Sequence, residues 1–119
     1  MKTINIKGKE YVPVVERVKE AHLQDKDISI VTEVIGEMPE YVTVKATVTF
    51  KGKLFTGHSS ASKTEGMMKA VALEVAETSA IGRALGFANI GLIDGIASAD
   101  EMRKVGKKVA NDDSDDVPF

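Results

Sequence analysis

The sequence predicts an α+β fold in which an antiparallel β-meander of three to four strands packs against a long helix with short flanking helices. Residues 41–51 (YVTVKATVTFK) alternate between apolar and polar side chains, which is typical of a strand with one buried face. Strand-like runs at 28–35 and 54–61 flank it through short connections, which favour antiparallel pairing. Residues 64–85 then have the length and composition of the dominant helix. A variant oligonucleotide-binding barrel is the alternative, for which the chain after this helix is short.

The first part of the chain predicts an edge strand and a helix. Residues 2–12 alternate weakly around Gly8, which indicates a short edge strand. Pro13 suits the first turn of a helix that runs to about Gln24, because proline lacks the N–H that would be unpaired there. The predicted apolar stripe of this helix is Val14, Val15, Val18, Ala21 and His22. Its solvent-facing side is predicted to hold Glu16, Arg17, Lys19 and Glu20.

The meander is delimited by its connections. The loop 36–40 contains Pro39 and joins the first long strand to the central one. Lys51-Gly52-Lys53 turns the chain sharply into the third strand. The side chains of the central strand that we expect in the core are Val42, Val44, Ala46, Val48 and Phe50.

The long helix is rich in small residues, which let its backbone lie close to the sheet. These residues are Ala70, Ala72, Ala76, Ser79, Ala80, Gly82 and Ala84. A glycine inside a helix costs about 1 kcal/mol relative to alanine, so Gly82 indicates a packing contact. Gly86 is predicted at the left-handed C′ position, with Arg83 in the last turn.

A connector and a final short helix follow. Residues 87–97 are apolar and glycine-rich, with room for one short strand. Ser98-Ala99-Asp100-Glu101 matches a capping box and predicts the start of a helix. The basic side of that helix would hold Arg103, Lys104, Lys107 and Lys108.

Length and composition bound the class of protein. A chain of 119 residues forms one domain, and the lack of cysteine excludes disulfides and thiolate metal sites. The N-terminus lacks an apolar signal region, and no apolar run approaches the ~18 residues of a membrane span. We therefore expect a cytoplasmic protein without membrane contact.

The formal charge of −2 averages two unlike parts. Residues 110–119 (ANDDSDDVPF) hold four aspartates and no base. Residues 1–109 set the 16 basic residues against 14 of the 18 acidic ones, a net charge of +2. A weakly basic body with an acidic tail indicates either nucleic-acid binding or masking of the body by its own tail. The predicted division is a single-stranded DNA-binding domain over 1–109 and a disordered, partner-binding tail over 110–119.

The polar face of the central strand predicts a nucleic-acid surface, because that strand carries no acid. Lys45, Lys51 and Lys53 supply positive charge, and the threonine hydroxyls between them can donate to phosphates. The predicted DNA-binding residues are Tyr41, Thr43, Lys45, Thr47, Thr49, Lys51, Lys53 and Arg83.

The sequence leaves alternatives open for the base-stacking residues and for the role of Arg83. Tyr41 is the base-stacking candidate on this face, and Tyr11 or Phe55 would join it. Arg83 is either a phosphate contact or a partner of the helix dipole.

The last nine residues, NDDSDDVPF, resemble the acidic tip of bacterial single-stranded DNA-binding proteins. That resemblance implies docking on replication and recombination proteins, with the Phe119 ring in a pocket and the aspartates against a basic rim. The residues that would bind partners are Asp112, Asp113, Asp115, Asp116, Val117, Pro118 and Phe119.

A second resemblance covers roughly residues 4–101. The stretches INIKGKEYVPV, FTGHSS, AETSAIGRALGFANIG and IASADE resemble small phage proteins with single-stranded DNA-binding and single-strand annealing functions. The resemblance implies coating of single strands and, for a phage-encoded protein, a location in the host cytoplasm. Annealing of complementary strands is the alternative activity, although annealing recombinases carry more chain for ring assembly.

The predicted function is a non-enzymatic single-stranded DNA-binding protein of phage replication or recombination, which recruits partners through its tip. One small domain offers few contacts, so we expect a homo-oligomer. A protein-bridging adaptor that never contacts DNA is the rival. We expect no metal and no cofactor, because His22 and His58 lack neighbours at ligand spacing and the sequence holds no GxxxxGK[ST] loop.

Overall fold

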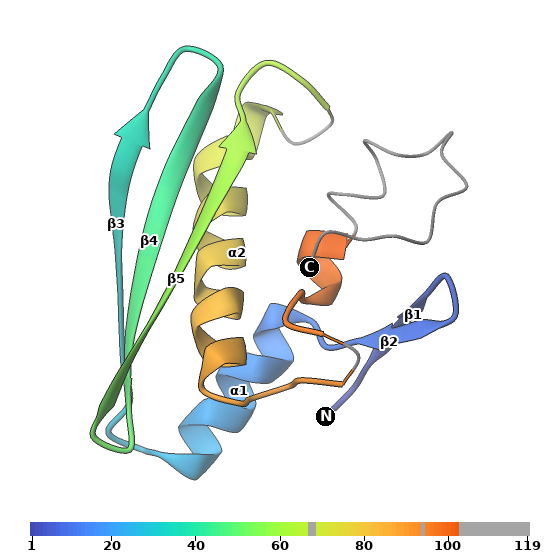
Figure 1. Ribbon diagram of the computed structural model, residues 1–119, viewed down its shortest axis with the longest axis vertical. Helices are drawn as coiled ribbons and strands as arrows, with labels where there is room; N and C mark the ends of the chain where they lie inside the picture. The colour runs from blue at the N-terminus through green and yellow to red at the C-terminus, as the bar shows by residue number, and fades with distance from the viewer. Residues whose placement is uncertain (67–68, 94, 103–119) are drawn as a thin grey trace.

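The computed structural model describes residues 1–66, 69–93 and 95–102 (Figure 1). The strands are β1 (Ile4–Ile6), β2 (Lys9–Tyr11), β3 (Ser29–Glu37), β4 (Tyr41–Phe50) and β5 (Lys53–Ser62). The helices are α1 (Val14–Gln24) and α2 (Ala72–Phe87), and the 3-10 turn η1 (Lys69–Val71) precedes α2. The antiparallel sheet β3-β4-β5 packs against α2, which confirms the predicted α+β meander.

The helices lie on one side of the three-stranded sheet. Figure 1 shows α2 along the sheet, with α1, the β1–β2 hairpin and residues 95–102 beyond it. No described element lies on the opposite face of the sheet in this view. The two described sheets do not close into a barrel, so the oligonucleotide-binding alternative is wrong. None of the described helices is long and apolar enough to cross a membrane.

The core lies between β4, β5 and α2. The five predicted core side chains of β4 are all buried, as the period-2 pattern required. A Cβ on Gly57 of β5 would lie 2.5 Å from the Ala84 nitrogen and 2.6 Å from the Ala80 oxygen. A Cβ on Gly82 would lie 2.6 Å from Val14 Cγ2. The small residues of α2 therefore bring its backbone into contact with β5 on one side and with α1 on the other.

α2 begins later than the sequence predicted. The prediction placed its start at Thr64, whereas regular α-helix begins at Ala72. Ser62 Oγ accepts the N–H groups of Thr64 (3.2 Å) and Glu65 (2.9 Å), and Gly66 has a left-handed φ of +80°. These features make residues 63–66 a turn, because a positive φ is incompatible with a right-handed helix.

α2 also ends later. Gly86 lies inside the helix, and Asn89, with φ +65°, occupies the left-handed position instead. The Ile90 N–H donates to the Leu85 carbonyl (3.0 Å), and the Asn89 N–H donates to the Gly86 carbonyl (2.9 Å). These two bonds form a Schellman motif with asparagine at C′. Arg83 consequently does not lie in the last turn, and the predicted helix-dipole role is wrong.

Two hairpins share the same turn sequence. The predicted edge strand over residues 2–12 is a hairpin of β1 and β2 that turns at Lys7-Gly8. Lys7 and Gly8 have φ values of 52° and 84°, and Lys51 and Gly52 at the β4–β5 turn have 51° and 77°. Positive φ at both central residues is the hallmark of the type I′ turn, which matches the twist of the strands it joins.

α1 begins one residue later than predicted, with Pro13 as its extended N-cap, and its faces differ from the prediction. It follows Pro13 and ends at Gln24, yet Val15 is 57% exposed and His22 is also exposed. Arg17, predicted to face solvent, is fully buried. The described residues of the 87–97 connector form no strand. Residues 99–102 form the predicted helical start, and Ser98 Oγ accepts the Glu101 N–H (3.2 Å) as its cap.

Candidate nucleic-acid interface

The three-stranded sheet has one face that no described helix covers, called here the open face (Figure 1). Its residues alternate with the buried ones of β4 and pair across the three strands in register. They are Ser29, Val31, Glu33, Tyr41, Thr43, Lys45, Thr47, Thr49, Leu54, Thr56, His58, Ser60 and Ser62. Five of the predicted DNA-binding residues lie together on this surface, because successive β4 side chains point to opposite faces.

The centre of the open face carries mixed charge. Lys45 of β4 lies opposite Glu33 of β3 and His58 of β5 in the strand register. β4 itself carries no acidic residue, as the sequence indicated, but β3 places Glu33 on the same face of the sheet. The negative charge of Glu33 cancels part of the positive potential around Lys45, because the two residues are paired across β3 and β4.

Hydroxyl groups dominate the rest of the face. Thr43 Oγ1 and Ser60 Oγ share a hydrogen bond of 2.6 Å across β4 and β5. Thr47 pairs with Thr56, and Thr49 pairs with the 69%-exposed Leu54. Hydroxyls can donate to phosphate oxygens without regard to base sequence, so this surface suits contacts to a backbone.

The positive end of the open face is the β4–β5 turn. Lys51 and Lys53 are exposed there, and the Lys51 ammonium lies 5.3 Å from the centre of the Phe50 ring. Lys53 pairs with the buried Phe50, so its position in β5 is on the helix side of the sheet and not on the open face itself. Asp25, at the end of α1, accepts the Lys51 N–H through Oδ2 at 2.7 Å. It also accepts the Asp27 N–H through Oδ1 at 3.0 Å. Asp25 thus ties the basic turn to the helix layer.

The backbone N–H donors of Lys51 and then Asp27 lower the pKa of Asp25 below its ordinary value of 3.8. A carboxylate with a lowered pKa supports the fold above its ordinary pKa and loses that effect as pH falls through the folded value. We expect the Lys51 amide proton to titrate with a midpoint below pH 3.8 in NMR spectra. The matching turn supplies the control, since the Gly8 N–H donates to the neutral Asn5 Oδ1 (3.1 Å). A Lys51 amide that follows the Gly8 amide through this pH range would contradict the contact.

One aromatic side chain lies on the open face among the described residues. Tyr41 is 44% exposed, at the end of β4 opposite the Lys51 turn. The other two stacking candidates are wrong. Tyr11 is buried in a small cluster near residues 97–102. Phe55 lies opposite Val48, on the core side of β5, and packs against the main core.

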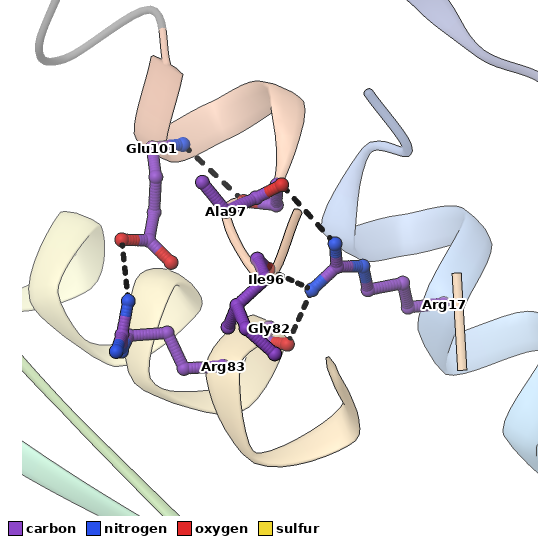
Figure 2. A network of polar contacts seen from close by, with 7 residues as sticks. Arg17, Gly82, Arg83, Ile96, Ala97 and Glu101 are labelled. Carbon is purple, nitrogen blue, oxygen red and sulfur yellow. Dashed lines mark hydrogen bonds and ion pairs between the residues drawn. The ribbon is translucent and has the colours of Figure 1, made fainter. Parts of the chain in front are cut away.

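Arg83 lies in the helix layer rather than on the open face. Its Nη1 is 3.6 Å from Glu101 Oε2, and its side chain is 25% exposed (Figure 2). The guanidinium is also 5.8 Å from the centre of the Phe87 ring. Arg83 is therefore not close to Lys45, and it contacts Glu101 and Phe87 of the same domain instead.

Arg17 is the principal residue that sequence reasoning misplaced. Its Nη1 donates to the carbonyls of Gly82 (2.7 Å) and Ile96 (2.9 Å), as Figure 2 shows. Its Nη2 donates to the carbonyls of Gly91 (3.3 Å) and Ala97 (3.2 Å). Arg17 joins α1 to the end of α2 and to the connector that follows.

The surroundings of Arg17 also affect its pKa. Burial lowers the pKa of Arg17, while the carboxylates of Glu101 and Asp100 oppose that shift and Arg83 adds to it. Four carbonyl acceptors and two nearby carboxylates make Arg17 a structural centre rather than a ligand contact. One sequence signal was available, because Arg17 follows Val14 by three residues and precedes Ala21 by four, within the apolar stripe.

The predicted partner-binding residues 112–119 lie outside the described residues, as do Arg103, Lys104, Lys107 and Lys108. Within 1–66, 69–93 and 95–102, no group of three or more histidine, aspartate or glutamate side chains is placed to hold a metal ion.

The fold is a small α+β domain in which α1 and α2 lie on one side of the three-stranded sheet and no described element lies on the other. Residues 19–88 match the family described as Slr1353 N-terminal dsRNA-binding domain-like. The chain belongs to this family. The match runs from within α1 to the end of α2, so it includes the whole β3-β4-β5 sheet. No curated protein and no solved structure matches the chain.

Proposed function

We propose that this protein is a nucleic-acid-binding domain that holds a single strand of DNA along the open face. The family description supports nucleic-acid binding in general. The observation that carries the finer proposal is the open face of β4, where five predicted contact residues alternate with the buried side chains of the core.

The layout of that face fits a flexible polyanion. A ten-residue strand such as β4 spans about 33 Å. The β4–β5 turn with Lys51 and Lys53 borders one end of the face, Lys45 lies at its centre, and Tyr41 lies at the other end. Lysine and threonine would contact phosphates, and Tyr41 would stack on a base without reading its identity. Binding of this kind is tolerant of sequence, as a strand-coating protein requires.

The proposed role is coating of single strands in phage replication or recombination, without catalytic turnover. The tail resemblance adds recruitment of replication or recombination proteins by residues 112–119, through a hydrophobic end beside a run of aspartates. Duplex RNA is the second candidate ligand, because the family is described as dsRNA-binding domain-like. A duplex is recognised by shape and backbone, so projecting basic turns would matter more there than Tyr41.

Reversing the three basic charges of the proposed surface tests this function. The variant Lys45→Glu, Lys51→Glu, Lys53→Glu is expected to bind labelled single-stranded DNA about tenfold or more weakly at low salt. Each lost phosphate contact makes the plot of log binding constant against log salt concentration shallower by about 0.7, so the loss of three contacts reduces the steepness by about 2. Fluorescence titrations at several salt concentrations measure both quantities.

The same titrations decide between ligands. Lys19→Glu, on the exposed side of α1, is the matched charge reversal away from the open face and should leave affinity near the wild-type value. Deletion of residues 112–119 should also preserve DNA affinity. Stronger binding to duplex RNA than to single strands would favour the second candidate. Unchanged affinity of the triple variant for every nucleic acid would favour the adaptor function and overturn the proposal.

A further inference from the structure

Strand β3 is an outer strand of the three-stranded sheet. It pairs with β4 on one side, and in Figure 1 no described element lies along its other side. The backbone N–H and C=O groups on that outer side can therefore accept another strand. Natural proteins usually protect such an edge, because it is a ready template for pairing with a second chain.

The side chains of β3 offer little protection. The strand SIVTEVIGE contains no lysine, arginine or proline, and its only charged residues are Glu33 and the terminal Glu37. Val31 is 59% exposed, and Val34 and Ile35 are each 49% exposed. A β-bulge between Val34 and Gly36 disturbs only the far end of the strand. The other outer strand, β5, begins with Lys53 and is followed by Lys63, the residue type that typically blocks edge pairing.

The strand is also held in position to receive a partner. Thr32 Oγ1 donates to Glu77 Oε2 of α2 at 2.7 Å, and Ile30 packs against the core. The segment Ser29–Val34 is thus a fixed, regular and exposed edge. A pre-formed edge loses less conformational entropy on pairing than a mobile segment would.

We propose that β3 pairs with β3 of a second copy of this chain, antiparallel about a two-fold axis. A two-fold axis pairs the same strand edge of both copies in antiparallel orientation, so the hydrogen-bonding groups of one edge match those of the other. Residues opposite each other must share a face, so a residue of the open face can oppose only another residue of the open face.

The register with Val31 opposite Val31 of the second copy suits the side chains. It places two β-branched residues together at the axis and sets each Ser29 opposite a Glu33, a hydroxyl beside a carboxylate. The register centred on Thr32 would instead place each Glu33 against a valine. The register centred on Glu33 would place two carboxylates together, which is destabilising.

Pairing of this kind produces a six-stranded sheet in which the two open faces are continuous. The inference does not depend on what the open face binds. A strand edge buries less area than the ~1,200–2,000 Å² of a standard interface, so the dimer should be reversible. We expect the mass in solution, measured without nucleic acid, to rise from one chain to two between about 1 µM and 1 mM.

Val31→Lys tests the interface directly. It sets two ammonium groups opposite each other at the axis, so the variant should remain a single chain over the whole concentration range. Because Val31 is exposed, its circular dichroism should match the wild type. Leu54→Lys is the matched control, since Leu54 lies on the same face, is 69% exposed and belongs to β5. This control should dimerise like the wild type.

Hydrogen exchange gives a second readout, in which amides of residues 29–34 gain protection as concentration rises and other strands do not. A wild type that stays a single chain at 1 mM overturns the proposal. So does a Val31→Lys variant that associates as well as or better than the wild type, or growth beyond two chains. Failure of DNA binding would leave all these results unchanged, which separates this proposal from the proposed function.

Discussion

Replacement of Arg17 by methionine is expected to abolish cooperative folding or to lower the free energy of unfolding by several kcal/mol. The guanidinium supplies donors to four carbonyls, those of Gly82, Gly91, Ile96 and Ala97. Each buried acceptor left without a donor costs about 1–3 kcal/mol. The total approaches the ~5–15 kcal/mol by which a small domain is stable. Urea unfolding followed by circular dichroism measures the loss.

Two further variants make the Arg17 experiment specific. Arg17→Lys retains the charge but lacks the planar fork of donors, so it should lie between the wild type and Arg17→Met. Lys19→Met changes a side chain that is 68% exposed on the same helix, and it should shift stability by no more than about 0.5 kcal/mol. An unfolding midpoint for Arg17→Met equal to that of Lys19→Met would show that the four contacts do not hold the domain together.

Gly57→Ala should cause the second large loss of stability. The new methyl group would lie within 2.6 Å of two backbone atoms of α2, the Ala84 nitrogen and the Ala80 oxygen. Neither atom can rotate away as a side chain would, so α2 must move off the sheet. Overpacking of a core typically costs about 1–3 kcal/mol, and a clash with backbone belongs at the upper end of that range. Thermal unfolding gives the measurement.

Gly36→Ala is the matched control for Gly57→Ala. Gly36 lies in β3, and a Cβ there would meet Thr43 Cβ at 3.7 Å, an ordinary van der Waals contact. Both substitutions add one methyl group to a strand glycine of the same sheet, so any difference between them reports the contact with α2. Equal melting temperatures for the two variants would rule out that contact as a source of stability.

The sheet was predictable because its signal is local. The alternation along β4 determines which side chains are buried, and the Lys51-Gly52 turn determines how β4 and β5 pair. The start of α2 was not predictable in the same way. The composition from Thr64 onward is helical, but Ser62 and Gly66 hold residues 63–66 as a turn through side-chain hydrogen bonds and a left-handed backbone.

The candidate site was predictable strand by strand but not across strands. The residues of β4 lie on one face as expected, whereas Glu33 reaches the centre of that face only through the pairing of β3 with β4. Likewise, Arg83 and Arg17 were placed by their position along a helix. Their actual environments depend on Glu101 and the connector, which lie far away in the sequence. A helical periodicity argument places charged residues on the solvent-facing side. It cannot detect that carbonyl groups from residues 82–97 surround the Arg17 guanidinium.

The position of the Arg17 acceptors also determines when the N-terminal helix can dock during synthesis. Those acceptors follow Arg17 by 65 to 80 residues, so a ribosome must complete nearly the whole domain before the guanidinium can reach them. The meander of β3, β4 and β5 closes through short turns and is available much earlier. α1 is short and rich in valine, and a helix of that kind is only marginally stable without tertiary contacts. α1 precedes the sheet and α2 in the chain, yet it is among the last elements to reach its native place.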